Sequence, residues 1–557
     1  MTFQRAVPKR LCLEPLPEKF AEHLRSFAFA GHDSVDMAAP ERIDMAAPER
    51  IDMAAPERIG VAAPERIDIE SPLLQQPLGW VPKVGADATC AAFRAARAVQ
   101  PEWHQLGVKK RAKIISKFHD LVFSNRELIM DLVQLETGKA RAGAFDEVTD
   151  VANNARYYAG QAPKLLRPQK KRGGMPVLTK TYLHHDPKGV VGQISPWNYP
   201  FSLGISDAIP ALLAGNTVVA KPDSQTPFTS LLIAHLLSVA GLPDGVFTVV
   251  VGSGGVVGTA IAENCDFLMF TGSTATGKVL AEQVSKRLVG FSAELGGKNP
   301  MIVTSDAHLD TAVRAITHAC LSNTGQLCVS IERIYVDQDI YQEFCERLAD
   351  SFRAQKLGGA LDWKNQVGSL VSAGQLETVE EFVADAKRAG ARVLTGGKPR
   401  LDLGKYFYEP TILLDVPDSA RLLREEVFGP VVYIQPVANV DDAVAAANGT
   451  CYGLNSSIFA APKTASKLAP RIHAGSVNIN DGYVAGWASI DSPIGGYKES
   501  GVSRRHGAEG LYKYTEPKTI AQQRGFPIWG PQWLSQKSWS KVLWRSLSLG
   551  KKTGLLR

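Results

Sequence analysis

The 557-residue sequence lacks the features that mark several large classes of protein. No run of about 18 uncharged apolar residues occurs, so a membrane-spanning helix is not expected. The N-terminal segment is charged and has no apolar core of the kind found in secretory signal peptides. The formal net charge is only +6, which does not indicate a nucleic-acid-binding protein with a dedicated basic face. We therefore expect a soluble, cytoplasmic protein that does not bind nucleic acid.

Cysteine is scarce and scattered along the chain. The seven cysteines form no Cys-x-x-Cys pair, and their number is odd. Neither a disulfide framework nor a zinc site is predicted, and a reducing compartment fits this usage best. The seven are Cys12, Cys90, Cys265, Cys320, Cys328, Cys345 and Cys451.

A short repeat precedes the part of the sequence that has globular composition. From Met37 to Asp68 the unit MAAPERID recurs with small changes, which places proline at positions 40, 48, 56 and 64. Proline at this frequency prevents a continuous helix, and each unit has too little apolar surface to form a core. We expect residues 1–68 to be a disordered segment rather than an interaction segment.

From about Ile69 to about Gln523 the sequence alternates helical patterns with short apolar runs. This alternation is typical of βαβ units, so the predicted fold class is α/β with a parallel sheet. The clearest predicted strands are GVVGQIS (189–195), NTVVAKP (216–222), GVFTVVVG (245–252) and CDFLMFTG (265–272).

Two glycine-rich segments are candidates for a nucleotide site. The segment GSGGVVG (252–258) is dense in glycine but lacks the GxGxxG spacing. The segment GSTATGK (272–278) matches GxxxxGK, but Val279 follows it where a phosphate-binding P-loop needs a hydroxyl. It follows an apolar strand and opens a helical run, so Gly272 and Ser273 would present backbone N–H groups to a pyrophosphate.

Seven segments together resemble the aldehyde dehydrogenase superfamily in order and spacing, over about residues 69–523. Within the superfamily the chain is similar to NADP-dependent succinate-semialdehyde dehydrogenases. The segments are SPWNYPF (195–201), KPDSQTP (221–227), FTGSTATG (270–277), ELGGKNP (294–300), NTGQLC (323–328), EEVFGPVV (425–432) and SPIGGYKESG (492–501).

The resemblance implies three catalytic residues. A planar aldehyde has no hydride to give until a nucleophile makes it tetrahedral, and Cys328 in NTGQLC is the implied nucleophile, forming a thiohemiacetal and then a thioester. Glu294 is the implied general base for thioester hydrolysis, a role that suits a partly desolvated carboxyl with a raised pKa. The Asn198 amide and the Cys328 N–H are the implied oxyanion donors, each contributing about 3 kcal/mol.

The resemblance also implies a nicotinamide cofactor. Lys221 matches a ribose-binding lysine, and Glu426 matches the glutamate that holds the nicotinamide ribose. NAD-preferring relatives commonly have a glutamate where this chain has Ser224, so we expect NADP, with NAD possible. No metal site is expected. The implied cofactor-binding residues are Trp197, Asn198, Lys221, Ser224, Gly272, Ser273, Leu295, Glu426 and Phe428.

The superfamily architecture implies a Rossmann-like cofactor domain, an α/β catalytic domain and a β oligomerisation arm. The arm would combine VLTKTYLHHDPKG (177–189) with LYKYTEPKTIAQQ (511–523), and its exposed edges predict a homodimer or homotetramer. The expected divisions are 69–296 for the cofactor domain, with an arm strand at about 175–188, 297–506 for the catalytic domain, 507–523 for the oligomerisation strand and 524–557 for a C-terminal tail.

The tail has the pattern of a basic amphipathic helix. At helical spacing Lys537, Lys541 and Arg545 fall on one side, and apolar residues including Trp539 and Val542 fall on the other. Such a helix could contact an anionic membrane surface or a partner. We favour the alternative that the tail packs on the body of the oligomer.

The expected substrate is a small aldehyde, which the resemblance names as succinate semialdehyde. Its carboxylate is best held by arginine, and well-known succinate-semialdehyde dehydrogenases supply two. This chain has Ser206 and Ser322 at those places, which leaves Arg167, Arg172 or a partner subunit as sources of a cation. Two alternatives stay open: a broad-range aliphatic or aromatic aldehyde dehydrogenase, and an inactive scaffold with the same fold.

Overall fold

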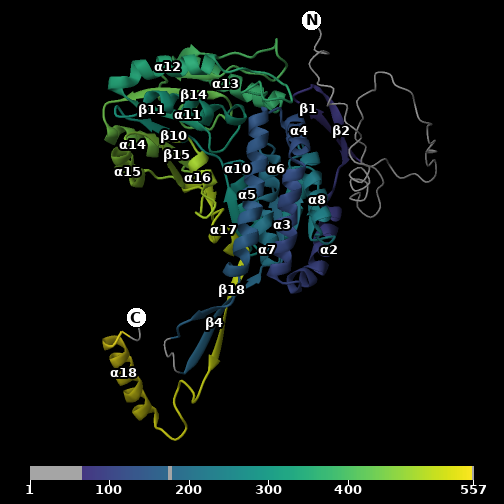
Figure 1. The fold of residues 1–557 in the computed structure, drawn as a ribbon, viewed down its shortest axis with the longest axis vertical. Coiled ribbons are helices and arrows are strands. Elements are labelled where there is room, and N and C mark those ends of the chain that lie inside the picture. The colour runs from purple at the N-terminus through teal and green to yellow at the C-terminus, as the bar shows by residue number, and fades with distance from the viewer. Residues whose placement is uncertain (1–64, 174–177, 555–557) are drawn as a thin grey trace, which may run out of the picture.

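The computed structural model describes residues 65–173 and 178–554, and two large sheets organise it (Figure 1). The first sheet has the strand order β17-β9-β8-β5-β6-β7. The four strands predicted from apolar runs are confirmed as β5, β6, β7 and β8, and they are parallel. The bounds are β5 (Val190–Ile194), β6 (Thr217–Lys221), β7 (Phe247–Val249), β8 (Phe267–Thr271), β9 (Gly290–Glu294) and β17 (Gly501–Val502).

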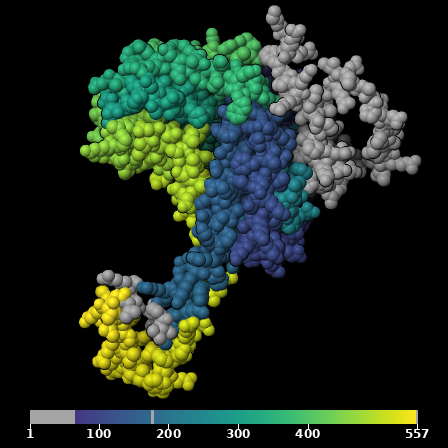
Figure 2. Space-filling model, in the orientation of Figure 1, coloured from purple at the N-terminus to yellow at the C-terminus, as the bar shows by residue number. Residues whose placement is uncertain are grey.

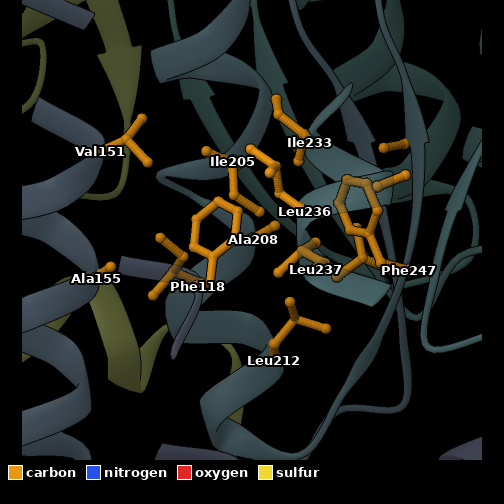
Figure 3. Packing of buried hydrophobic residues seen from close by; sticks show 14 of the residues in the cluster. Phe118, Val151, Ala155, Ile205, Ala208, Leu212, Ile233, Leu236, Leu237 and Phe247 are labelled. Atoms are coloured by element: carbon orange, nitrogen blue, oxygen red, sulfur yellow. The ribbon is translucent and has the colours of Figure 1, made fainter. Parts of the chain in front are cut away.

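Helices pack around this sheet, which explains why its strands are apolar on both faces. Figure 3 shows part of the resulting core, where Phe118 of α3, Leu212 of α7 and Leu237 of α8 are fully buried. The helices are α2 (Ala86–Gln105), α3 (Val108–Ser124), α4 (Arg126–Thr137), α5 (Arg141–Leu165), α6 (Pro200–Ile205), α7 (Ala208–Ala214), α8 (Pro227–Ala240), α9 (Thr259–Asn264) and α10 (Thr274–Ser285).

The second sheet has the order β12-β13-β14-β11-β10-β15-β16 and is parallel except for the β12–β13 pair. Its strands are β10 (Asn299–Val303), β11 (Ile331–Asp337), β12 (Arg392–Thr395), β13 (Thr411–Leu414), β14 (Val431–Val437), β15 (Asn455–Phe459) and β16 (Ser476–Ile479). The accompanying helices are α11 (Leu309–Leu321), α12 (Tyr341–Arg353), α13 (Ala373–Ala389), α14 (Val440–Asn448), α15 (Pro462–Leu468) and α16 (Val484–Ala488).

The strand β17 differs from the expected division of the chain. Residues 297–506 were predicted to belong to the second unit, yet β17 within them pairs antiparallel with β9 of the first sheet, Gly501 opposite Glu294. A two-residue strand has no periodic signal in the sequence. A Cβ at Gly501 would lie 2.6 Å from the carbonyl oxygen of Ala293, so glycine permits this close pairing. The segment after β17 is therefore placed beside the end of β9.

The predicted arm pairing is confirmed. The strand β18 (Thr515–Gln523) pairs antiparallel with β4 (Thr179–Pro187) along its whole length, and the arm projects from the body in Figures 1 and 2. The third strand, β3 (Gln169–Lys171), was not predicted because three polar residues carry no strand pattern. The short helix α17 (Glu509–Tyr512) leads into β18.

The first described strand begins earlier than the predicted boundary at Ile69. β1 (Arg66–Ser71) pairs with β2 (Gln76–Pro82), and Ile69 is buried. The letters ERID at 65–68 repeat those of earlier copies, so the sequence alone could not separate this copy from them. Pairing with a later segment is what makes it a strand. Residues 1–64 of the predicted disordered segment lie outside the described residues.

The C-terminal tail forms α18 (Gln536–Lys552), as its spacing predicted. Trp539 packs against Gly530 and Phe526, and its Nε1 donates to the carbonyl of Ile528 at 2.8 Å. The three basic residues of the predicted stripe are exposed. In Figure 1, α18 lies near the end of the arm and away from the two large sheets.

No helix within residues 65–173 and 178–554 is long and apolar enough to cross a bilayer.

Candidate active site

The loop that carries Cys328 has an unusual backbone. After α11 the chain enters a short 3-10 turn (Ser322–Gly325) in which Asn323 and Thr324 have φ of 50° and 59°. Gly325 continues with φ of 75°, and a Cβ there would lie 2.0 Å from a backbone oxygen of the neighbouring loop at 429. This left-handed stretch accounts for Asn323 and Gly325, which tolerate positive φ, whereas the β-branched Thr324 is strained there.

Gln326 fixes the shape of that loop. Its side-chain amide donates to the carbonyl of Asn323 at 3.1 Å, and its side-chain oxygen accepts from the N–H of Val371 at 3.0 Å. Asn299 holds the other side, because its amide donates to the carbonyls of Cys328 and Ser330, each at 2.7 Å. Hydrogen bonds from the side chains of Gln326 and Asn299 to the backbone therefore hold the loop that carries the cysteine.

Cys328 and Glu294 line one small cavity of about 30 Å³ between the two large sheets. Burial raises the pKa of the Cys328 thiol to about 12, and the neighbouring carboxyls of Glu426 and Glu294 act in the same direction. Arg505, which lines the same cavity, opposes them. At neutral pH the sulfur is therefore a thiol that needs a base before it can attack a carbonyl.

Glu294 is the last residue of β9, and only 6% of it is exposed. Among the described residues no group hydrogen-bonds its buried Oε1. Burial raises its pKa to about 7, although Arg505 and Lys513 favour the ionised form. A carboxyl that changes protonation state near neutral pH suits alternating proton transfers.

Asn198 lies in the loop between β5 and α6. Its side-chain amide donates to the carbonyl of Gln326 at 3.1 Å, and its own carbonyl accepts from Lys139 at 2.7 Å and from Asn323 at 2.9 Å. These contacts bind the loop at 195–199 to the loop that carries Cys328. They bring all three predicted catalytic residues to one region, while the roles stay predictions.

Sequence reasoning missed two buried glutamates that support the site. Glu147 pairs with Lys139 at 2.5 Å and accepts from the N–H groups of Phe201 and Ser202, at the start of α6. Because no local side chain caps α6, this distant carboxylate satisfies its first N–H groups. The only sequence signal for this role is that no residue near the start of α6 provides a side-chain cap.

Glu332 is the second missed residue. It pairs with Lys298 at 2.6 Å and accepts from the N–H groups of Val427 and Phe428. These bonds hold the loop in which Phe428 has φ of 58°, a strained conformation for an aromatic residue. Its partners are far away in the sequence, so no local pattern indicated the role.

The predicted cofactor residues of the first sheet lie at the carboxyl ends of its parallel strands. Lys221 ends β6, Ser224 follows it, and Gly272 and Ser273 follow β8 at the start of α10. The Ser224 hydroxyl donates to the carbonyl of Gly252, after β7, at 3.3 Å. Carboxyl ends of parallel strands are where open α/β sheets bind nucleotides.

Lys221 tests whether these residues fit an anionic cofactor. Only 5% of it is exposed, and its Nζ donates to the carbonyl of Pro222 at 2.8 Å. Within the described part of the chain, no carboxylate lies within ion-pair distance of it. Burial lowers its pKa. A buried ammonium with a carbonyl as its partner fits the ribose or phosphate of a dinucleotide.

The remaining predicted cofactor residues lie between the sheets. Glu426 accepts from the N–H of Gly297 at 2.8 Å, and burial together with Glu332 raises its pKa to about 8. Trp197 and Phe428 meet edge to face, with ring centroids 5.6 Å apart.

Leu295 packs closely against α10, where a Cβ at Gly277 would lie 2.6 Å from its side chain. Its predicted cofactor contact stays a prediction.

The first sheet has parallel strands whose carboxyl ends contain the predicted cofactor residues, and the cavity beside it is lined by a cysteine and a buried glutamate. This is the arrangement that the resemblance to the aldehyde dehydrogenases implied. The chain belongs to the aldehyde dehydrogenase family, whose sequence profile matches residues 61–520. It is an aldehyde dehydrogenase, as the seven segments predicted.

The chain is also similar to individual proteins and solved structures of this family. A Mycolicibacterium smegmatis protein whose name proposes a succinate-semialdehyde dehydrogenase [NADP(+)] is 53% identical over 464 residues, covering 83% of this chain and 90% of the relative. A solved NADP-dependent enzyme of Escherichia coli matches with a TM-score of 0.79 and 37% identity, over 83% of this chain and 95% of that one. An NAD+ complex of aldehyde dehydrogenase from Bacillus cereus matches with a TM-score of 0.79 and 34% identity, over 82% and 93%. The predicted aldehyde dehydrogenase fold is confirmed.

Proposed function

We propose that the chain oxidises succinate semialdehyde to succinate with NADP as the electron acceptor, through a thioester on Cys328. The observation that carries the aldehyde chemistry is the cavity shared by Cys328 and Glu294, with Asn198 bound to the same loop. The substrate and cofactor rest on the similarity to relatives with those names. A scaffold would not need all three side chains at one place.

The first half of the reaction makes the thioester. The Cys328 thiol gives up its proton to solvent, and the sulfur then bonds to the aldehyde carbon while the carbonyl oxygen becomes the oxyanion. One amide hydrogen of Asn198 is used on Gln326, so the second, with the backbone N–H of Cys328, is available to the new oxyanion. The bound nicotinamide supplies the acceptor for the hydride that leaves this carbon. Cys328 then holds the acyl group as a thioester.

The second half releases the acid. Glu294 as a carboxylate removes a proton from a water molecule, whose oxygen bonds to the thioester carbon. The carbon–sulfur bond breaks, and Cys328 leaves as a thiolate that takes this proton from Glu294, so both residues return to their starting states. The small volume of the cavity keeps other nucleophiles away from the thioester.

A second candidate function, broad-range oxidation of uncharged aldehydes, is favoured by the side chains around the site. Ser206 is buried and donates to Asp150 at 2.9 Å, while Ser322 donates to the carbonyl of His318 at 2.8 Å. Arg167 and Arg172 are exposed near the arm and do not line the cavity. The apolar and aromatic residues that do line it are Leu203, Val329, Leu454, Tyr483, Trp487 and Ile494.

A panel of aldehydes separates the two candidates. We expect succinate semialdehyde to give the highest kcat/KM when it is compared with hexanal and benzaldehyde, measured as NADPH formation. If either uncharged aldehyde is faster by about tenfold, which is about 1.4 kcal/mol in the transition state, the broad-range function replaces the proposal.

The cofactor preference is tested at Ser224. In Ser224→Glu a carboxylate would face the 2′-phosphate, so we expect kcat/KM for NADP to fall at least about tenfold while that for NAD changes little. Ser224→Gln is the matched control, because it adds the same bulk without the charge. Equal losses in both variants would mean that size rather than charge matters here.

We also propose that the arm joins two subunits, in a dimer or a dimer of dimers. The strand β18 is hydrogen-bonded to β4 and forms one edge of its sheet, and most of its residues are exposed. Such an edge is suited to pairing with a second chain. The cytoplasmic location stays a prediction from cysteine usage. The contacts of α18 with a lipid surface or with the oligomer also stay predictions, which rest on the pattern of the tail.

A further inference from the structure

A buried ionic cluster lies next to Glu294 and comes from three separate segments. Asp207 precedes α7, Arg505 follows β17, and Lys513 follows α17. Arg505 Nη2 lies 3.2 Å from Asp207 Oδ2, and Lys513 Nζ lies 3.4 Å from Asp207 Oδ1. All three side chains are at least nine-tenths buried. Among these three side chains the cations outnumber the carboxylate by one, and the buried Asp150 also acts on Arg505.

The backbone fixes Arg505 relative to Glu294. Gly501 pairs with Glu294 across β17 and β9, and Arg505 exchanges two backbone hydrogen bonds with Ile494, at 2.7 and 2.9 Å. The guanidinium carbon also lies 5.2 Å from the centre of the Trp487 ring. Arg505 is therefore held from both its backbone and its side chain.

Three polar atoms of Glu294 and the cluster have no hydrogen bond within the described residues: Nη2 of Arg505, Oδ2 of Asp207 and Oε1 of Glu294. Of these residues, Arg505 and Glu294 line the cavity that contains Cys328. Lys513 also contacts β9, the strand that ends at Glu294, because its Nζ donates to the Ser292 hydroxyl at 3.1 Å. An ionised Glu294 would supply a further negative charge next to the two cations of the cluster.

We propose that Arg505, held by Asp207, is a positioning residue that keeps Glu294 ionised and turned toward Cys328 during thioester hydrolysis. The inference rests on the proposed function, because it assigns a partner to the proposed base. It also accounts for the buried cation in a cavity with otherwise largely apolar walls.

The surroundings of Glu294 agree in sign with this role. Burial is the largest of the influences that raise the pKa of Glu294, and Arg505 is the largest of those that lower it. Lys513 and Arg504 act in the same direction, and Asp207 opposes them. The charged and titratable groups that act on Glu294 are Arg505, Lys513, Asp207, Arg504, Cys328 and Tyr514.

Arg505→Gln is the direct test, with Arg505→Lys as the variant that retains the charge. Stopped-flow measurements would follow the first NADPH formed per site and the later steady rate, from about pH 6 to about pH 9.5. In Arg505→Gln we expect the acidic limb of the steady rate to move up by at least about one pH unit, which from a pKa of about 7 is a loss of about fivefold at pH 7 that is recovered at high pH. The first turnover should still form one NADPH per site, and Arg505→Lys should restore most of the profile.

Arg504→Gln is the matched control, because its neighbouring guanidinium bonds to the carbonyls of Ser503 and Gly496 and acts less on Glu294. If Arg505→Gln does not fold, Arg505→Gln with Asp207→Asn removes the buried pair together. We expect a smaller shift of the same sign in this double variant, because the influence of Arg505 on Glu294 exceeds that of Asp207.

Two results would overturn the inference. One is an unchanged pH profile in folded Arg505→Gln or in the double variant. The other is a KM increase for succinate semialdehyde alone, with hexanal unaffected, which would make Arg505 a site for the substrate carboxylate. Absence of any NADPH formation by the unaltered enzyme with succinate semialdehyde would instead refute the proposed function, so the two failures are distinguishable.

Discussion

Replacing Cys328 by alanine should reduce aldehyde oxidation by at least about 10⁴-fold, because no other group can hold the acyl intermediate. Binding of NADP, followed by fluorescence titration, should be unchanged, since Cys328 lies between the sheets and not among the strand ends that contain Lys221 and Ser224. Cys451→Ala is the matched control: that cysteine is exposed, and its variant should retain full activity. Sustained turnover by Cys328→Ala would remove Cys328 as the nucleophile.

Replacing Glu294 by glutamine should separate the two halves of the reaction. We expect one NADPH per active site and then a steady rate lower by about 10²- to 10⁴-fold, the usual contribution of a general base. The first turnover should persist because the variant also removes a negative neighbour that raises the pKa of Cys328. Mass spectrometry of the trapped protein should show an acyl group on Cys328.

The same glutamate sets an expectation for pH. The base must be ionised, and its pKa is raised to about 7, so hydrolysis should fall about tenfold per unit as the pH drops below that value. Glu425→Gln, at an exposed glutamate paired with Arg421, should leave the profile unchanged. Full steady turnover by Glu294→Gln would contradict the assignment of the base.

The sequence predicted those parts of the molecule whose signals are local. The apolar runs that became β5, β6, β7 and β8 are short, and turn residues bound them, so period and composition were sufficient. The helix α10 begins directly after β8, as the glycine and the helical pattern of this segment predicted. The family resemblance likewise predicted Cys328, Glu294 and Asn198 as site residues, and the structure places them in one region.

The remaining features depend on contacts between distant segments. Glu147 and Glu332 resemble any other glutamate until the N–H groups that they accept from are known. The strand β17, which pairs with β9, has only two residues, so its sequence contains no periodic pattern that could predict it. The role proposed for Arg505 could not be predicted from the sequence, because it depends on Asp207 and Glu294, which lie in other elements.

The arm and the ionic cluster share one covalent stretch of chain. Lys513 ends the cluster, Thr515 begins β18, and the carbonyl of the single residue between them, Tyr514, accepts hydrogen bonds from Asn216 and Lys188. These two hydrogen bonds fix the start of the arm at Tyr514, next to Lys513, which acts on Glu294. A tag or a surface attachment on β18 would therefore act on a strand that begins two residues after Lys513, a cation that acts on Glu294.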